Sequence, residues 1–229
     1  NDAARAKVFT KIGRELIVAI REGGSADPSV NSKLKDCIAK AKANNVPNDN
    51  IERIIKKAAS GGDSANYEAV TYEGYGPNGV AVIVEALTDN RNRTAGEVRH
   101  YFDKFGGNMG TQGCVSFMFT KKGVLVIERE DLDKDEDTVM SDALEYGASD
   151  FEADEDVFTI YTEPEDFSAV RDDLEKAGYT FVSAELEMVP STYTKLEDEE
   201  SITKMQKMLD MFEDNDDIQN VWHNWEMED

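Results

Sequence analysis

The sequence predicts an α+β protein, in which an N-terminal three-helix domain is followed by two α/β (ferredoxin-like) domains, one inserted in the other. Three observations lead to this fold class. Apolar residues recur at helical spacing as far as Gly61-Gly62, and at strand spacing after these glycines. Residues 120–190 carry elements in the order β-α-β-β-α-β, which is typical of a ferredoxin-like unit. A further helix and strand follow Pro190, and they supply what residues 61–119 lack for a balanced α/β layer.

We therefore expect three domains. Residues 1–60 form a helical, basic domain. Residues 61–119 and 190–229 together form a discontinuous α/β domain. Residues 120–189 form an acidic ferredoxin-like domain that is inserted into it.

The first 60 residues predict three amphipathic helices. The first helix ends at Gly23-Gly24, and its apolar positions are four residues apart, at Val8, Ile12, Leu16 and Ile20. Asp27-Pro28 predicts the start of the second helix, as an N-cap followed by a proline in the first turn. The segment VPNDN predicts the start of the third. Short connections between such helices indicate a small bundle.

Strands follow the second glycine pair. YEAVTYEGYGPNGVAVIVEAL predicts a hairpin with a Pro-Asn-Gly turn. Its glycines Gly74, Gly76 and Gly79 match G-x-G-x-x-G, but a dinucleotide site needs that motif to open a helix, and here it opens a strand. We therefore expect these glycines to serve the turn and no nucleotide to bind.

The segment TDNRNRTAGEVRH, residues 88–100, predicts an exposed polar loop that leads into a helix. Thr94 and Glu97 match a capping box, with Thr94 as the N-cap. Arg91 and Arg93 would then precede a helix N-terminus, where free N–H groups and the helix dipole favour an anion. Neither arginine falls on a core position, so replacing either should change stability by less than about 0.5 kcal/mol.

The rest of the chain predicts the remaining elements in order. CVSFMF and GVLVIER predict strands, followed by a helix at 136–146, the strands ASDFEAD and VFTIYTE, a helix at 166–177 and the strand FVSAELEMV. The helix after Pro190 spans about residues 198–212, and IQNVWHNWEM predicts a last strand.

Charge is distributed unevenly along the chain, whose formal net charge is −23. Residues 1–60 hold 12 Lys and Arg against 7 Asp and Glu, a net charge of +5. Residues 120–190 hold 6 against 22, a net charge of −16. A polyanion is therefore expected to dock on the basic front of the chain, supported by the arginines of residues 88–100.

Several classes of function lack support in the sequence. We find no catalytic motif, no metal-ligand spacing and no phosphate loop, so we expect no enzyme, no cofactor, no metal site and no small-molecule substrate. No apolar run is long enough to span a bilayer, so no membrane association is expected. Two cysteines, Cys37 and Cys114, form no disulfide pattern, which together with these points favours a cytoplasmic protein.

Positive side chains on amphipathic helices, and Asn or Arg in an exposed loop, can contact phosphates and base edges. No catalytic residue is proposed. The candidate nucleic-acid-binding residues are Lys7, Lys11, Arg14, Arg21, Lys33, Lys40, Arg91, Asn92, Arg93 and Arg99.

Four stretches together resemble the YebC/PmpR family, whose relatives include the mitochondrial translational activators. They are ARAKVFTKIGRELIVAIREGG, VPNDNIERIIKKA, YEGYGPNGVAVIVEALTDNRNRTAGEVRH and KFGGNMGTQGCVSFMF. The resemblance extends over essentially the whole chain. It implies a helical N-terminal domain followed by two α/β domains, one inserted in the other, as the element order also indicates.

The resemblance implies a non-enzymatic nucleic-acid-binding regulator of gene expression, described in the family as a probable DNA-binding transcriptional regulator. The alternative that it implies is a ribosome-associated translation factor that binds ribosomal RNA and relieves stalling. The charge distribution leaves a second alternative open, an acidic protein-interaction module whose rear half meets a basic partner.

Overall fold

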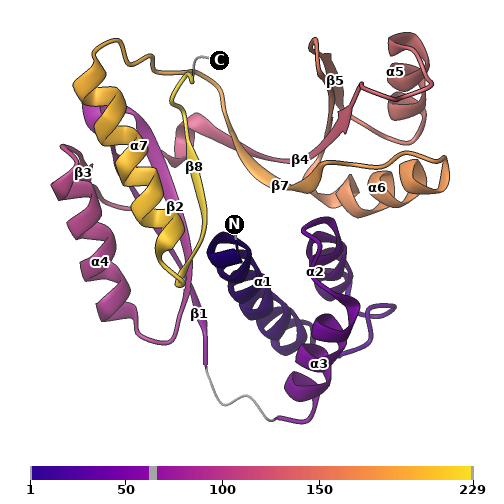
Figure 1. The fold of residues 1–229 in the computed structure, drawn as a ribbon, viewed down its shortest axis with the longest axis horizontal. Coiled ribbons are helices and arrows are strands. Elements are labelled where there is room, and N and C mark those ends of the chain that lie inside the picture. Colours follow the sequence, from indigo (N-terminus) through magenta and orange to yellow (C-terminus); the bar gives the residue numbers. More distant parts are fainter. Residues whose placement is uncertain (1, 62–65, 228–229) are drawn as a thin grey trace. The chain divides into compact units, whose positions relative to one another are not determined.

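The fold class is confirmed by a computed structural model of the chain, which describes residues 2–61 and 66–227. Within these residues, seven α-helices accompany two four-stranded sheets (Figure 1). Three helices come first in the sequence. The strands of the second sheet come after the third strand of the first sheet and before the last helix of the chain.

The chain forms two compact units. The first comprises Asn1–Val18, Lys56–Thr120 and Val189–Asp229, and the second comprises Ala19–Ile55 and Lys121–Met188. The helices α1 (Asp2–Gly23) and α3 (Asn48–Ala59) therefore run from one unit into the other. The division into three domains stays a prediction.

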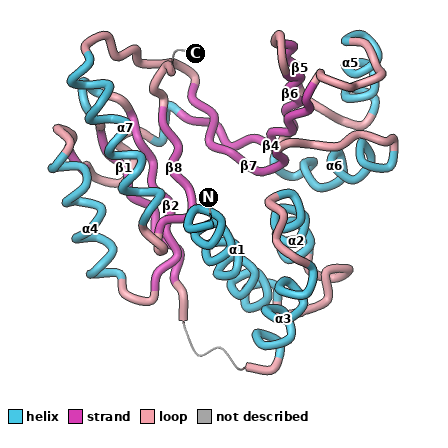
Figure 2. Tube along the Cα trace, in the orientation of Figure 1, coloured by secondary structure: helices cyan, strands magenta, loops and turns pink. Residues whose placement is uncertain are grey.

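The first unit contains an antiparallel sheet in the order β3-β1-β2-β8, of which Figure 2 labels β1, β2 and β8. Its strands are β1 (Glu68–Tyr75), β2 (Ala81–Thr88), β3 (Asn108–Met109) and β8 (Ile218–His223). The expected hairpin pairs β1 with β2 from Glu68–Thr88 to Tyr75–Ala81. β8 pairs with β2, so the C-terminal strand completes the sheet as the sequence indicated. The connection order β-β-α-β-α-β distinguishes this sheet from a ferredoxin-like one.

Two helices, α4 (Arg91–Lys104) and α7 (Glu199–Asp214), pack on this sheet. Val82 and Val84 of β2 meet Phe102 of α4 and Phe212 of α7 in one core, where the two rings lie edge to face with centroids 5.5 Å apart. The strand β2 is buried at nearly every position, which explains its continuous apolar run VAVIV.

The second unit contains the sheet β5-β6-β4-β7, the strand order of a ferredoxin-like fold. Its strands are β4 (Phe119–Glu128), β5 (Asp150–Ala153), β6 (Val157–Thr162) and β7 (Ser183–Pro190). Alternate residues of β4 and β6, such as Leu125 and Ile160, pack against α5 (Glu136–Glu145) and α6 (Phe167–Lys176).

The second unit also contains α2 (Ser32–Ala43), whose start the sequence placed too early. The prediction of an N-cap at Asp27 is wrong, because Asn31 caps the helix by accepting a hydrogen bond from the Leu34 N–H. Asp27 instead accepts hydrogen bonds from the backbone N–H and the hydroxyl of Ser29 and closes a local turn. Asparagine and aspartate supply the same capping oxygen, so local pattern alone did not decide between them.

The predicted strand CVSFMF is also wrong for most of its length. Ser116–Met118 form a 3-10 turn, and β4 begins only at Phe119. This turn follows the loop that returns from β3, and its contacts with the Glu73 side chain are described below.

Candidate nucleic-acid interface

The expected loop before α4 is the first turn of the helix itself. Asn90 is the N-cap, and its side-chain oxygen accepts a hydrogen bond from the Arg93 N–H at 3.1 Å. The predictions that Thr94 caps the helix and that Arg91 and Arg93 precede it are therefore wrong, because both arginines lie in its first turn. The pair Asp89-Asn90 offered the correct signal, since both residue types are strong N-caps.

Thr94 has a different role, because its side chain is completely buried. Its hydroxyl lies 2.7 Å from the Thr88 hydroxyl and 2.9 Å from a carboxylate oxygen of Asp217. The hydroxyl also approaches the carbonyl oxygen of Asn90 at 3.2 Å. Thr94 thus links the first turn of α4 to the end of β2 and the start of β8.

Asp217 is the centre of an ion-pair cluster within the first unit. It is 4% exposed, and its two oxygens accept hydrogen bonds from Arg14 at 2.7 Å and Arg93 at 2.9 Å. Burial alone would raise the pKa of Asp217, but the hydrogen bonds from Arg14, Arg93 and Thr94 outweigh burial and hold its pKa below the ordinary value. Two arginines proposed as phosphate contacts therefore neutralise a buried carboxylate of their own chain.

Two further candidates on α1 also contact acidic residues or backbone oxygens of the first unit. Lys7 binds the Asp216 carboxylate at 2.9 Å and the Asp214 carbonyl at 2.7 Å. Lys11 donates to the Glu213 carbonyl at 2.6 Å, at the C-terminal end of α7, where carbonyl groups attract cations. Lys7 and Lys11 of α1 thus contact the end of α7 and the residues that follow it.

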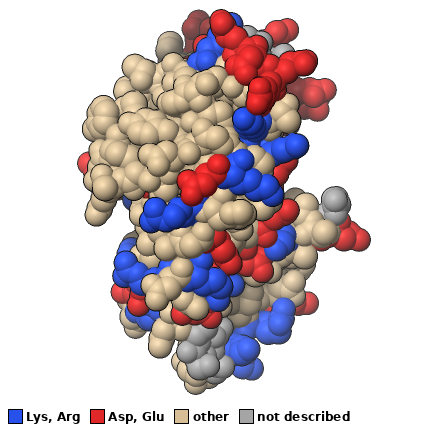
Figure 3. Space-filling model, turned by 90° about the vertical axis from the view of Figure 1, so that its left-hand side faces the viewer, with Lys and Arg blue, Asp and Glu red and all other residues tan. Residues whose placement is uncertain are grey.

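The helix α4 presents the remaining candidates of this unit to solvent. Arg91, Asn92 and Arg99 are all exposed, and Arg91 lies 3.5 Å from Glu68 in a pair whose two side chains are 67% and 57% exposed. An ion pair this exposed contributes little, so the guanidinium is available to another anion. On the face that bears α4, Lys and Arg are interspersed with Asp and Glu in the lower half of the view, and a large area at the upper left carries neither (Figure 3).

The other three candidates belong to the second unit. Arg21 is exposed in the last turn of α1. Lys33 pairs with Glu22 at 2.8 Å, and Lys40 lies 3.6 Å from Glu185. Of the ten candidates, the structure brings together Arg14 and Arg93 at Asp217, and it places Arg91, Asn92 and Arg99 on one exposed helix.

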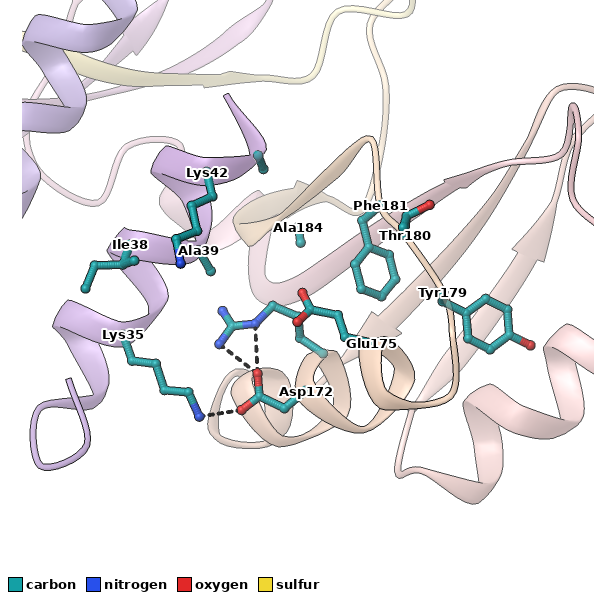
Figure 4. A pocket seen from close by; sticks show the side chains of 12 residues that line it. Lys35, Ile38, Ala39, Lys42, Asp172, Glu175, Tyr179, Thr180, Phe181 and Ala184 are labelled. Carbon is teal, nitrogen blue, oxygen red and sulfur yellow. Dashed lines mark hydrogen bonds and ion pairs between the residues drawn. The ribbon is translucent and has the colours of Figure 1, made fainter. Parts of the chain in front are cut away.

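The second unit also holds a cavity of about 460 Å³ between α2 and α6 (Figure 4). Lys35 and Lys42 line it from α2, and Asp172 and Glu175 line it from α6. Lys35 binds Asp172 at 2.6 Å, and the buried Arg171 pairs with both Asp36 and Asp172. Because cations and carboxylates balance each other here, the cavity does not provide the surplus positive charge that a polyanion requires.

Residues 2–61 and 66–227 show neither a metal-binding cluster nor a helix suited to a membrane. These residues contain no group of three or more His, Cys, Asp or Glu side chains arranged to hold a metal ion. None of the helices formed by them is both long enough and apolar enough to cross a bilayer.

The sequence does not indicate the Asp217 cluster, because the residues that bind Asp217 lie far from it in the chain. Arg14 and Arg93 precede Asp217 by 203 and 124 residues, and no spacing rule connects them. A single acidic residue in a segment as acidic as EDNDD gives no signal of its own.

The chain is similar to bacterial proteins of about its own length. A "probable transcriptional regulatory protein" from Acetivibrio thermocellus is 64% identical over 224 residues, covering 98% of this chain and 92% of the relative. A protein of the same description from Finegoldia magna is 60% identical, covering 99% and 93%. The crystal structure of a conserved hypothetical protein from Aquifex aeolicus superposes with a TM-score of 0.87 at 43% identity, covering 100% of this chain and 93% of that one.

Family comparisons account for nearly the whole sequence. Residues 1–61 match the TACO1/YebC protein N-terminal domain. Residues 67–225 match the TACO1/YebC second and third domain. The chain therefore belongs to the TACO1/YebC family.

Proposed function

We propose that this protein is a non-enzymatic, cytoplasmic regulator of gene expression that binds nucleic acid, as a DNA-binding transcriptional regulator. The relatives are named probable transcriptional regulatory proteins, which supports a regulatory role. The observation that carries the proposal is the exposed group Arg91, Asn92 and Arg99 on α4. Arginine forms paired hydrogen bonds with phosphate, and asparagine can reach base edges.

Charge supports this location within a strongly acidic chain. Residues 120–190 carry a net charge of −16 and repel a polyanion. In contrast, α4 holds all four Lys and Arg residues found between Gly61 and Thr120, with Lys104 as its last residue. Electrostatic screening over about 8 Å at physiological ionic strength allows a basic surface to bind although the net charge of the chain is negative.

A ribosome-associated translation factor is the second candidate function. A ribosome offers RNA to basic surfaces and basic proteins to acidic ones, so both the arginines of α4 and the acidic residues 120–190 would find partners there. An acidic protein-interaction module would use only the acidic residues 120–190, to bind a basic protein.

Binding measurements distinguish these functions. The protein would be titrated at one salt concentration into duplex DNA and structured ribosomal RNA, and sedimented with ribosomes. A transcriptional regulator binds DNA without ribosomes, and a translation factor sediments with ribosomes and binds RNA more tightly than DNA. Failure to bind any nucleic acid or ribosome would contradict the proposal.

A further inference from the structure

Three segments of the first unit that are distant in sequence lie side by side. The Met118 carbonyl accepts hydrogen bonds from the N–H and the hydroxyl of Ser191, at 2.8 and 3.1 Å. Thr194 in turn donates its N–H to the Asn224 carbonyl and accepts one from Glu226, both at 2.8 Å. The 3-10 turn at Ser116–Met118 is thus connected through residues 191–194 to the chain around residues 224–227.

Each segment contributes one large apolar side chain to solvent. Phe117 is 77% exposed, Tyr193 is 59% exposed and Met227 is 58% exposed. Among the residues described for the first unit, these three are all of the exposed large hydrophobic side chains. We call these three residues, Phe117, Tyr193 and the non-aromatic Met227, the aromatic patch after its two rings. Because hydrogen bonds join the three segments, these residues stand on neighbouring pieces of backbone, and such a group of exposed apolar residues needs an explanation that an isolated one does not.

The turn that carries Phe117 is held by a buried carboxylate. Glu73 of β1 is 5% exposed and accepts hydrogen bonds from the backbone N–H groups of Gly113, Val115 and Ser116, at 2.6, 3.1 and 2.7 Å. Burial alone would raise the pKa of Glu73, but these hydrogen bonds outweigh burial and lower its pKa. The carboxylate therefore stays charged and fixes the turn, so Phe117 is presented on a rigid support.

Negative charge is missing from the two segments that carry Phe117 and Tyr193, whereas Glu226 adjoins Met227 in the third segment. Residues 104–120 contain no Asp or Glu, nor do residues 189–196, in a chain with 48 acidic residues among 229. A nucleic-acid strand can approach these two segments without meeting carboxylates, whereas a basic protein would find no complementary charge on them.

We propose that the aromatic patch binds unpaired bases of single-stranded nucleic acid by stacking on Phe117 and Tyr193, which rests on the proposed function. Exposed aromatic rings on a rigid support stack on any base, because every base has a π face. Bases in a duplex are already stacked and offer no free face to the patch. The patch thus adds a preference for single strands or loops that the arginines of α4, which contact phosphates, do not provide.

The test uses the full chain and a single-stranded oligonucleotide with one 2-aminopurine, whose fluorescence reports stacking. Phe117→Ala and Tyr193→Ala are compared with Phe117→Trp, which keeps an aromatic face. The matched control is Leu144→Ala, since Leu144 is 54% exposed in the second unit. Affinity for a duplex of the same sequence is measured in parallel, and urea unfolding checks that each variant is folded.

The expected result is a loss of single-strand affinity of at least about fivefold in both alanine variants, with duplex affinity unchanged and fluorescence quenching lost. Phe117→Trp should retain quenching, and Leu144→Ala should match the unmodified protein. Equal single-strand affinity in all variants would overturn the stacking site and leave the proposed function standing, even if the patch then proved to bind a protein. Absence of any nucleic-acid binding by the unmodified protein would instead overturn both.

Discussion

At the scale of single residues, the Asp217 carboxylate binds the side chains of Arg14, Arg93 and Thr94 beside the candidate interface. Its replacement by Asn would remove the buried counter-charge that the largely buried Arg14 shares with the partly exposed Arg93. We expect Asp217→Asn to lower the free energy of unfolding by about 2–4 kcal/mol, measured by urea denaturation. The control is Asp216→Asn, because Asp216 is 45% exposed and its pair with Lys7 is worth less than about 1 kcal/mol. Equal costs for the two variants would refute the central role of Asp217.

A second residue, Glu187 of β7, makes the stability depend on pH. Burial, followed by the nearby charge of Glu185, raises the pKa of Glu187 to about 7. The folded protein therefore holds this proton more tightly than the unfolded chain, so stability falls as pH rises from the ordinary carboxyl pKa through 7. Glu187→Gln keeps a neutral side chain, and we expect it to be more stable than the unmodified protein by about 1–3 kcal/mol at pH 8.

At pH 4 the same variant should show no such gain, because Glu187 is already protonated in both the folded and the unfolded states. Thermal unfolding of both proteins between pH 4 and 8 measures the difference. A constant gain across that range would show that the effect is not due to ionisation of Glu187.

At the scale of elements, the first turn of α4 depends on Asn90 for its cap. Asn90→Ala leaves the Arg93 N–H without its partner, and we expect a loss of about 1 kcal/mol. Asn92→Ala is the matched control, since Asn92 is exposed and one helical turn holds both residues. If Asn92→Ala cost as much as Asn90→Ala in chemical denaturation, the cap assignment would be wrong.

The expected effect of replacing Arg93 on stability differs between the sequence and the structure. The sequence placed Arg93 away from the core and predicted a change below about 0.5 kcal/mol on its replacement. Because Arg93 binds both Asp89 and the buried Asp217, we now expect Arg93→Ala to cost about 1–2 kcal/mol of stability and Arg91→Ala to cost almost none. Similar unfolding curves for the two variants would contradict this distinction.

The order of helices and strands followed from periodicity, because each element buries one face and its apolar residues must recur at the period of that element. Cap positions were less secure, since Asp27 and Thr94 offer the same chemistry as the true caps, Asn31 and Asn90. The prediction of a strand at CVSFMF failed because Ser116–Met118 form a turn, and because the N–H groups of Val115 and Ser116 bind Glu73, which lies about 40 residues away in sequence. Roles that depend on remote partners have no local signature.

At the scale of the whole molecule, charge and exposure together define where a polyanion can bind. Most of the negative charge belongs to residues 120–229, and several cations of the front half are already bound to carboxylates or carbonyl groups of the same chain. Among the candidates of the first unit, Arg91 and Arg99 of α4 are exposed arginines that bind no buried carboxylate in the structure.

The salt dependence of nucleic-acid affinity in arginine variants tests this claim most directly. Arg91→Gln/Arg99→Gln would be compared with the unmodified protein and with Lys176→Gln, which removes an exposed positive charge from α6. We predict that the double variant binds more weakly and that its plot of log affinity against log salt concentration is flatter by about one to two units, while Lys176→Gln changes neither. Unchanged affinity and slope in the double variant would contradict nucleic-acid binding through α4.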